Sequence, residues 1–410
     1  MRSLLRRTLL AAGALAGMGM LAPSAMAQTG AEFYKGKTVT YIVSTSPGGG
    51  YDLYGRLVAD YMQKYLPGST FVVKNLPGAG HLVGTNTLYA SKADGLTIGT
   101  FNTGLIYNQL IGLDGVKFDL TKMSWIGKAA ADPRVIVAAP QTNIKSMKDL
   151  SEQKADINFS TAGVGSAAYV ETTVLLNVLK LPIKIQSGYN GNDDQLAMRR
   201  GEIQGAVASR SSWQQFIDNG YGRFIAQIGG SEKDLPQLST IVTDPAAKAL
   251  VALVESQGEL SRLTAGPPGI PADRLAALRE AYRKAMADPE LQQKAQAGGR
   301  PLEPAYGEDV AEKIKAALKQ PPTTIALLKE AMTAKAPVAE TKGTIAEWDG
   351  RKNFTLKTAN GKAVKGEISG SRTAVTVAGQ KADRGALKVG MICTLQSDQG
   401  TAEAKTVACN

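Results

Sequence analysis

The stretch Ser46-Pro47-Gly48-Gly49-Gly50-Tyr51-Asp52 is the segment of this chain best suited to bind an anion. Residues 38–44 before it predict a short strand, and apolar residues at helical spacing after it predict a helix over residues 52–65. Unpaired backbone N–H groups and the positive end of the helix dipole favour negative charge at such a turn. The alternative is a tight turn that binds nothing.

The glycine stretch does not fit the usual phosphate-binding motifs. It lacks the Gly-Lys-Ser/Thr of a Walker loop and the Gly-x-Gly-x-x-Gly of a dinucleotide site. The pattern therefore disfavours nucleotide chemistry, and we expect no cofactor.

A second glycine loop, Thr161-Ala162-Gly163-Val164-Gly165-Ser166, follows a predicted strand at 157–160 and precedes a helix with an apolar face. The same alternative, a turn without a ligand, applies to it. Two such loops facing each other across a cleft could offer N–H donors to both ends of a dicarboxylate, or to one carboxylate from two sides.

Several side chains could add to such a site. His81 is either a polar surface or cap residue or a donor that faces the ligand. Asp193 and Asp194 could form an acid–base pair, although capping of a helix suits at least one of them better. Arg210, after a predicted strand at 205–209, could hold a carboxylate or lie solvated on the surface.

The sequence is poorly equipped for catalysis. His81 is its only histidine, which excludes histidine-based metal clusters and leaves a Ser-His-Asp triad a single candidate base. No arrangement supplies a nucleophile, a base and an orienting group together. We therefore expect no catalytic residues and no metal site.

The N-terminus resembles an export signal. Basic Arg2, Arg6 and Arg7 precede the apolar residues 9–21, and Ala25-Met26-Ala27 fits a cleavage site. A retained membrane anchor is the alternative. Cleavage near Gln28 predicts a periplasmic protein, exported by the general secretory route or the twin-arginine route.

The distribution of charge disfavours nucleic-acid binding, and the number of cysteines limits the possible disulfides. The signal's three arginines account for +3 of the formal charge of +11, so the remaining chain carries +8, spread without a Lys/Arg run of nucleic-acid type. Cys393 and Cys409, the only cysteines, predict one disulfide in an exported chain.

The elements that position the loops alternate between strand and helix over residues 38–101 and again over 157–209. This alternation predicts two parallel sheets covered by helices, with ligands at the carboxyl ends of the strands. Residues 264–336 return to helix. After Ala336-Pro337 the pattern changes to short strands around an Asn360-Gly361 turn, which predicts a small β module of barrel-like type.

An ordered series of motifs resembles the substrate-binding receptors of tripartite tricarboxylate transporters, the TctC or Bug family. The series extends from about Lys37 to Gly299. Its members are the two glycine loops, Val72-Val73-Lys74-Asn75-Leu76-Pro77-Gly78-Ala79-Gly80, Ala93-Asp94-Gly95-Leu96-Thr97-Ile98, Gly188-Tyr189-Asn190-Gly191, Leu235-Pro236-Gln237-Leu238-Ser239-Thr240 and Ala265-Gly266-Pro267-Pro268-Gly269-Ile270-Pro271.

The resemblance implies an α/β type II periplasmic-binding-protein (Venus flytrap) fold of two doubly wound domains that close on a small organic acid. We expect a signal at 1–27, domain 1 at 28–134 and 240–336, domain 2 at 135–239, and the β module at 338–410. The candidate ligand-binding residues are Ser46, Pro47, Gly48, Gly49, Gly50, Tyr51, Asp52, His81, Thr161, Ala162, Gly163, Gly165, Ser166, Tyr189, Asp193 and Arg210.

The resemblance also implies partners. The expected protein is a monomer that delivers a dicarboxylate, tricarboxylate or aromatic carboxylate to a two-component membrane permease. A ligand sensor that feeds a signalling partner is the first alternative. An exported carboxylate-processing enzyme and a structural envelope protein are the others.

The chain departs from the family pattern at three positions. Tyr51 stands where the family usually has Thr, His81 where it has Gly, and Asn190 where it has Lys. Tyr51 and His81 could form a stacking or hydrogen-bonding wall, which predicts a preference for an aromatic or nitrogen-bearing acid. The β module lies outside the usual receptor.

Overall fold

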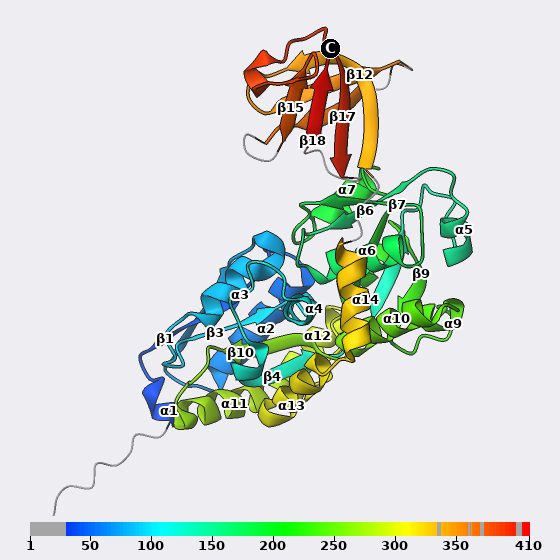
Figure 1. The fold of residues 1–410 in the computed structure, drawn as a ribbon. Helices are drawn as coiled ribbons and strands as arrows, with labels where there is room; N and C mark the ends of the chain where they lie inside the picture. Colours follow the sequence, from blue (N-terminus) through cyan, green and yellow to red (C-terminus); the bar gives the residue numbers. More distant parts are fainter. Residues whose placement is uncertain (1–29, 334–337, 360, 362, 370–372, 399–403) are drawn as a thin grey trace, which may run out of the picture.

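The computed structural model describes residues 30–333, 338–359, 361, 363–369, 373–398 and 404–410. The predicted export signal lies outside these residues. The described chain forms two α/β lobes and a separate β module, which is drawn in orange and red at the top of Figure 1.

The first lobe is built on a six-stranded mixed sheet in the order β11-β4-β10-β3-β1-β2. Its strands are β1 (Thr38–Val43), β2 (Thr70–Asn75), β3 (Thr97–Phe101), β4 (Ser124–Ala130), β10 (Ser261–Gly266) and β11 (Ala305–Tyr306). β1 pairs in parallel with β2 and β3, whereas β10 runs antiparallel to β3 and β4. The late strand β10 therefore lies inside the sheet that the N-terminal residues begin.

Helices cover this sheet on both faces. They are α1 (Gly30–Phe33), α2 (Gly50–Lys64), α3 (Leu82–Tyr89), α4 (Gly104–Ile111), α11 (Ala272–Ala287), α12 (Pro289–Ala297) and α13 (Gly307–Leu318), with 3₁₀ turns η1 (Ala79–His81) and η2 (Leu120–Lys122). Tyr54, Val58 and Met62 recur at helical spacing on α2 and are buried against Leu278 and Tyr282 of α11. Because these three side chains are buried against α11, the orientation of α2 and the position of its N-terminus are fixed.

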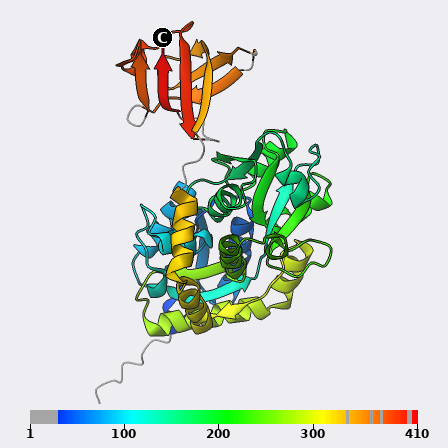
Figure 2. The same ribbon diagram turned by 45° about the vertical axis from the view of Figure 1, so that its right-hand side comes forward.

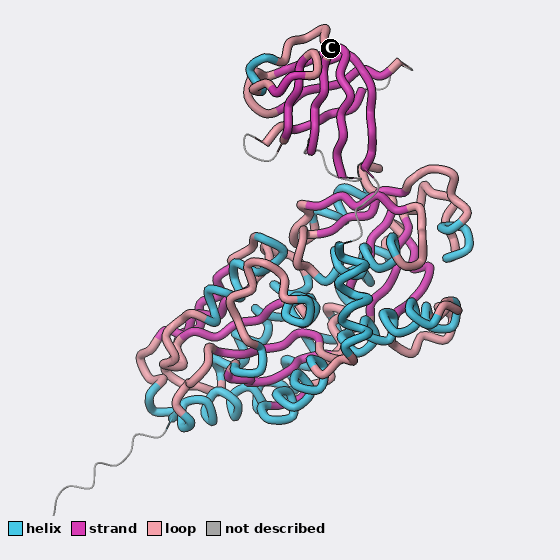
Figure 3. The backbone as a smooth tube through the Cα atoms, viewed as in Figure 1, coloured by secondary structure: helices cyan, strands magenta, loops and turns pink. Residues whose placement is uncertain are grey.

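The second lobe is built on a five-stranded sheet in the order β7-β6-β8-β5-β9. Its strands are β5 (Arg134–Ala138), β6 (Ile157–Thr161), β7 (Ile183–Ser187), β8 (Gly205–Ser209) and β9 (Arg223–Ile228). Its helices are α5 (Met147–Ser151), α6 (Ala167–Asn177), α7 (Asp193–Arg199), α8 (Arg210–Asp218), α9 (Leu238–Ile241) and α10 (Pro245–Gly258), and α14 (Pro322–Thr333) packs against α6 and α10. Figure 3 shows the two helix-covered sheets side by side with this late helix between them.

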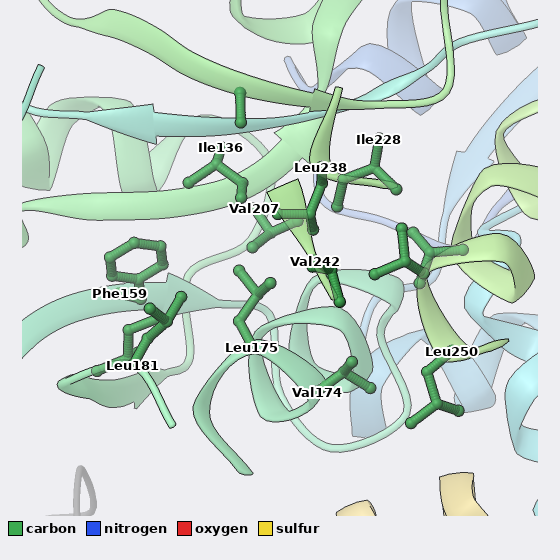
Figure 4. Packing of buried hydrophobic residues seen from close by; sticks show 14 of the residues in the cluster. Ile136, Phe159, Val174, Leu175, Leu181, Val207, Ile228, Leu238, Val242 and Leu250 are labelled. Carbon is green, nitrogen blue, oxygen red and sulfur yellow. The ribbon is translucent and has the colours of Figure 1, made fainter. Parts of the chain in front are cut away.

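The core of the second lobe does not stop where the predicted domain 2 ends. Leu250 on α10 is buried in one cluster with Ile136, Val207 and Ile228 of the sheet, as Figure 4 shows. The expected domain 1 includes residues 240–258, but these residues pack on the second sheet. The apolar side of α10 is buried against that sheet, and the chain returns to the first sheet only at β10.

The two lobes are joined where the chain crosses between the sheets. The backbone N–H of Asp132 donates to the carbonyl oxygen of Gly258 at 2.9 Å, so the outgoing and returning segments are hydrogen-bonded to each other. We call residues 131–133 and 258–260 the crossing segments.

The C-terminal β module is one seven-stranded sheet in the order β14-β13-β12-β17-β18-β15-β16. Its strands are β12 (Val338–Trp348), β13 (Asn353–Thr358), β14 (Ala363–Glu367), β15 (Ala374–Val377), β16 (Gln380–Lys381), β17 (Ile392–Asp398) and β18 (Ala404–Cys409), with the turn η3 (Arg384–Ala386). In the described residues the end strands β14 and β16 do not pair, so the sheet is open where a barrel-like closure was expected. Figure 2 shows the module as a curved body beyond the lobes.

The Sγ atoms of Cys393 on β17 and Cys409 on β18 are joined in a disulfide within this module. The two residues lie directly opposite each other in the antiparallel ladder and are buried. The bond therefore connects strands of the module and touches neither lobe.

Two further properties concern the described residues alone. None of their helices combines the length and apolarity that crossing a bilayer requires. They also contain no group of three or more His, Cys, Asp or Glu side chains placed to hold a metal ion.

Candidate functional site

A small cavity of about 110 Å³ lies between the two lobes, at the carboxyl ends of β1, β3, β6 and β8. Its walls come from both lobes. They comprise Thr45, Gly49, Gly50, Tyr51, His81 and Asn102 of the first lobe, and Arg134, Ser160, Thr161, Ala162, Ser166, Ala168, Tyr189, Gly191, Asn192, Asp194, Gln195, Val207, Ala208, Ser209, Ser212 and Trp213 of the second. The strand ends thus meet where open α/β sheets usually bind ligands.

The first glycine loop is held in place by a carboxylate of its own helix. Asp52 on α2 accepts hydrogen bonds from the Gly48 backbone N–H at 2.9 Å, Arg56 Nε at 3.0 Å and Asn75 Nδ2 at 2.8 Å. Burial of Asp52 opposes ionisation, but these donors outweigh it and hold its pKa below the usual value. Asp52 therefore shapes the loop and does not line the cavity.

Gly49 and Gly50 bring the first loop unusually close to the second lobe. A Cβ atom on Gly50 would lie 2.1 Å from Ser212 Oγ, and one on Gly49 would lie 2.9 Å from the Cα atom of Gly191. An added Cβ at either position would force these neighbours to shift. The two glycines therefore permit the close approach of the lobes beside the cavity.

Tyr51, the first large side chain after these glycines, is buried in the cavity wall. The guanidinium carbon of Arg262 lies 4.3 Å from the centre of its ring. Arg262 in turn forms a buried ion pair with Asp132 of the crossing segment and donates to Ser211 Oγ at 3.0 Å. The aromatic wall is thus attached to the connection between the lobes.

The second glycine loop is held partly from the opposite lobe. Within the loop, Ser166 donates to the carbonyl oxygen of Gly163 at 2.8 Å and caps α6. From the first lobe, Asn108 Nδ2 donates to the carbonyl oxygen of Gly165 at 2.7 Å, and Asn102 Oδ1 accepts from the Ala167 N–H at 3.1 Å. These bonds link the second glycine loop to residues that follow β3 of the first lobe.

Two buried polar atoms in the wall have no hydrogen-bond partner in the described structure. They are His81 Nδ1, on a side chain that is 5% exposed, and Ser160 Oγ, on a side chain that is 2% exposed. Burial lowers the pKa of His81 to about 4, so its imidazole is neutral near pH 7. Leaving such groups unpaired costs free energy, which a bound molecule with matching polar atoms would recover.

The charged groups of the wall differ in their partners. Arg134 is buried and donates from Nε to Glu171 Oε2 at 2.7 Å and from Nη1 to Ser209 Oγ at 2.8 Å. Asp194 accepts from the neighbouring Gln195 N–H at 2.8 Å. Burial, reinforced by the charge of Asp193, raises the pKa of Asp194 to about 7.

The structure brings half of the sequence-predicted residues together. Those that line the cavity are Gly49, Gly50, Tyr51, His81, Thr161, Ala162, Ser166 and Tyr189. Gly48 lines an adjoining outer cavity of about 380 Å³, and Gly163 lines a surface hollow next to Val164. Ser46, Pro47, Asp52, Gly165, Asp193 and Arg210 line neither the inner nor the outer cavity.

Arg210 and Asp193 have other contacts. Arg210 Nη1 pairs with Glu232 at 3.0 Å, and its guanidinium lies over the ring of Phe224. Asp193 is exposed and accepts from the Asn190 N–H at 3.3 Å, so the adjacent Asp194 occupies the wall. The carboxylate-holding role predicted for Arg210 has no support in this arrangement.

Sequence reasoning missed Asn102, Arg134, Ser160 and Ser209. Each stands at the end or start of a strand on the cavity side. Polar residues at strand ends were a usable signal for all four. Asn102 and Arg134 bond to Ala167 and Glu171 of α6, far away in the sequence, and such partners the sequence does not reveal.

Residues 55–324 match the family described as tripartite tricarboxylate transporter family receptor, TctC. The chain belongs to this family. Among curated relatives, a UPF0065 protein of Bordetella pertussis is 28% identical over 230 residues, which cover 53% of this chain and 66% of that protein. Protein BugT of the same organism is 28% identical over 169 residues, which cover 39% of this chain and 50% of BugT.

Solved structures show that the two lobes have the fold of periplasmic binding proteins. The periplasmic binding protein BugD superposes with a TM-score of 0.62 at 22% identity, over 73% of this chain and 99% of its own. MatC of Rhodopseudomonas palustris with bound malate superposes with a TM-score of 0.58 at 18% identity, over 72% of this chain and 98% of its own. R. palustris Rpa4515 with adipate superposes with a TM-score of 0.59 at 16% identity, over 71% of this chain and 97% of its own. The TctC-type fold thus accounts for the lobes.

Proposed function

We propose that this chain is a periplasmic solute-binding receptor that captures one small organic carboxylate between its lobes and delivers it to a tripartite tricarboxylate-type membrane permease. The observation that carries the proposal is the cavity between the lobes, whose wall contains the buried, unpartnered atoms His81 Nδ1 and Ser160 Oγ. Buried polar atoms without a protein partner are typical of a binding site for a polar ligand.

The donors in the wall suit a carboxylate. Gly50 and Tyr51 stand in the first turn of α2, and Ala168 stands in the first turn of α6. Backbone N–H groups in a first helical turn have no acceptor within their own helix. Aligned with two helix dipoles, they favour a negatively charged group placed between the lobes.

The mechanism is closure of the lobes without a bond being broken. The crossing segments connect the lobes, and the Asn102 and Asn108 contacts to the second glycine loop cross between them. A ligand that touches both walls adds to these contacts, so it shifts the population toward closure. Release to a permease would follow when the lobes separate.

The relatives support the same class of ligand. Two proteins with this fold were solved with malate and with adipate, which are dicarboxylates. Membership of a transporter receptor family supports a receptor with permease partners over an enzyme.

Thermal-shift measurements on residues 28–410 test the proposal. We expect one class among dicarboxylates, tricarboxylates, aromatic acids and amino acids to raise the melting temperature in a concentration-dependent way. Consumption of the bound acid would contradict the proposal in favour of an enzyme. Absence of any shift across the panel would contradict carboxylate capture itself.

A further inference from the structure

Arg262 in β10 of the first lobe is buried and reaches across to the second lobe. Its Nη2 atom donates to Asp132 Oδ2 in the crossing segment, to Ser211 Oγ at 3.0 Å and to Ser212 Oγ at 3.2 Å. Both serines stand in the first turn of α8. Arg262 lines neither the inner nor the outer cavity, so any effect that it has on a ligand must pass through other residues.

Two tyrosines of α2 hold the same guanidinium from the side of the first lobe. Its central carbon lies 4.3 Å from the ring centre of Tyr51 and 4.8 Å from that of Tyr54. A cation that is shielded from water is attracted to an aromatic ring more strongly than an exposed one. Because Tyr51 lines the inner cavity, Arg262 connects a residue of the cavity wall to the second lobe.

The conformation of Arg262 is costly in two ways. Its backbone has a φ of 59°, in the left-handed region that residues with a Cβ atom rarely adopt. Its Nε and Nη1 atoms are buried and have no hydrogen-bond partner among the residues that the structure describes. Such costs persist where the surrounding contacts over-determine the conformation, and strained groups of this kind cluster at functional sites.

We propose that Arg262 is a positioning residue that holds the second lobe against the first before a ligand arrives and keeps Tyr51 in the cavity wall. This inference rests on the function proposed above and adds a residue that sets ligand affinity without touching the ligand. Two of the three hydrogen bonds of Nη2 end on α8, so their loss favours separation of the lobes. A ligand must then supply the free energy that brings the lobes together, which weakens its apparent affinity.

Two variants remove the connection in different ways. Arg262→Met combined with Asp132→Asn removes the guanidinium without leaving a buried carboxylate unpaired. The Asn side chain keeps an oxygen for the Ser211 N–H, which Asp132 Oδ1 accepts at 3.0 Å. Ser211→Ala combined with Ser212→Ala removes the two acceptors on α8 and leaves the pair of Arg262 and Asp132 in place.

Arg274→Met is the matched control. Arg274 on α11 also lies over an aromatic ring, that of Phe33 on α1, but both residues belong to the first lobe. Its replacement therefore removes a cation–ring contact of the same kind without touching the contact between the lobes. Circular dichroism melting confirms that the control and both variants fold.

Spin labels on the two lobes measure whether the lobes stay together. Lys92 in the first lobe and Lys148 on α5 in the second have side chains that are 86% and 80% exposed, so both accept a label through substitution by cysteine. The native cysteines are joined in a disulfide and do not compete for the label. Pulsed electron paramagnetic resonance then gives the distance between the labels with and without an acid.

We expect one narrow distance distribution in the ligand-free wild type and in Arg274→Met. Both variants of the Arg262 network should give a broader distribution with a longer mean. An acid of the thermal-shift panel that binds the wild type should bind these variants about tenfold more weakly, and at saturation it should restore the narrow distribution. Such recovery would not follow from general damage to the fold.

An unchanged narrow distribution in both variants would overturn the role of Arg262. A broad distribution in the ligand-free wild type would overturn it as well, because the lobes would then separate with Arg262 in place. If no acid binds, the receptor function proposed above fails, while the ligand-free distances still decide whether Arg262 holds the lobes together.

Discussion

The two glycine loops look alike in sequence but are held in different ways. The first loop is held from within its own lobe, through the bonds of Asp52 to Gly48 and to Asn75. The second loop is held from across the cleft, through Asn102 and Asn108. The first loop is therefore held by contacts within one lobe, whereas the second depends on contacts that cross between the lobes.

This difference separates two kinds of polar group at the site. Asp52 has several donors and a pKa below its usual value, and it builds the loop. Asp194 has no cationic partner among the residues that the structure describes; its pKa is raised to about 7, and it lines the cavity. Satisfied groups shape the site, and unsatisfied ones are available to a ligand.

The largest expected effect comes from preventing the lobes from meeting at the first loop. In Gly50→Ala the new Cβ would lie 2.1 Å from Ser212 Oγ and 3.0 Å from Arg262 Nη2. We expect ligand affinity to fall about 100-fold or more, measured by calorimetry, while the separate lobes keep their folds. Gly385→Ala, in the β module with nothing within 4 Å of the added Cβ, is the control and should bind normally.

The second effect concerns the stability of the first loop. Asp52→Asn removes a charged acceptor from Gly48, Arg56 and Asn75, which should lower the free energy of unfolding by about 2 kcal/mol. Because the folded pKa of Asp52 is lowered, its contribution is present above about pH 4 and is lost as pH falls through the folded value. Urea unfolding of both proteins from pH 6 to pH 2.5 measures the difference, and a gap that does not narrow as pH falls would contradict the role of the carboxylate charge.

The third effect concerns the second loop. Asn102→Ala removes the acceptor for the Ala167 N–H across the cleft and for the Gly104 N–H within its own lobe. We expect affinity to fall about tenfold, since the closed state loses roughly one hydrogen bond of about 1.4 kcal/mol. If affinity were unchanged while stability fell, the contact would belong to the first lobe alone.

The smallest effect is the titration of His81. Its folded pKa of about 4 lies below the unfolded value, so its contribution to stability is complete above about pH 6.5 and is lost as pH falls toward 4. Between pH 6.5 and 5.5 the wild type should lose about 1 kcal/mol more than His81→Asn, in which Asn tolerates the left-handed backbone of this position. Equal pH slopes in chemical unfolding would show that His81 is not buried as described.

The elements with strong local signals could be predicted from the sequence. The strand Gly205–Ser209 has the predicted bounds, and both glycine loops join a strand to a helix as expected. Turn glycines and apolar periodicity determine structure over a few neighbouring residues, so these elements can be predicted from the sequence without knowledge of the fold.

The parts that depend on distant contacts were not predictable. The sequence could not show that α10 (Pro245–Gly258) packs on the second sheet, that Arg210 pairs with Glu232, or that Asp194 rather than Asp193 turns to the cavity. Nor did the short strands of the β module reveal that their sheet stays open. In each case the deciding neighbour lies far away in the chain or on another strand.

The central claim is that the cavity between the lobes holds one small carboxylate and that the lobes must meet to enclose it. Titration calorimetry with the acid found in the thermal-shift panel tests this most directly, on wild type, Gly50→Ala and Gly385→Ala. The account predicts one bound acid per chain for wild type and Gly385→Ala, and binding at least 100-fold weaker for Gly50→Ala. Equal binding by all three proteins would contradict it.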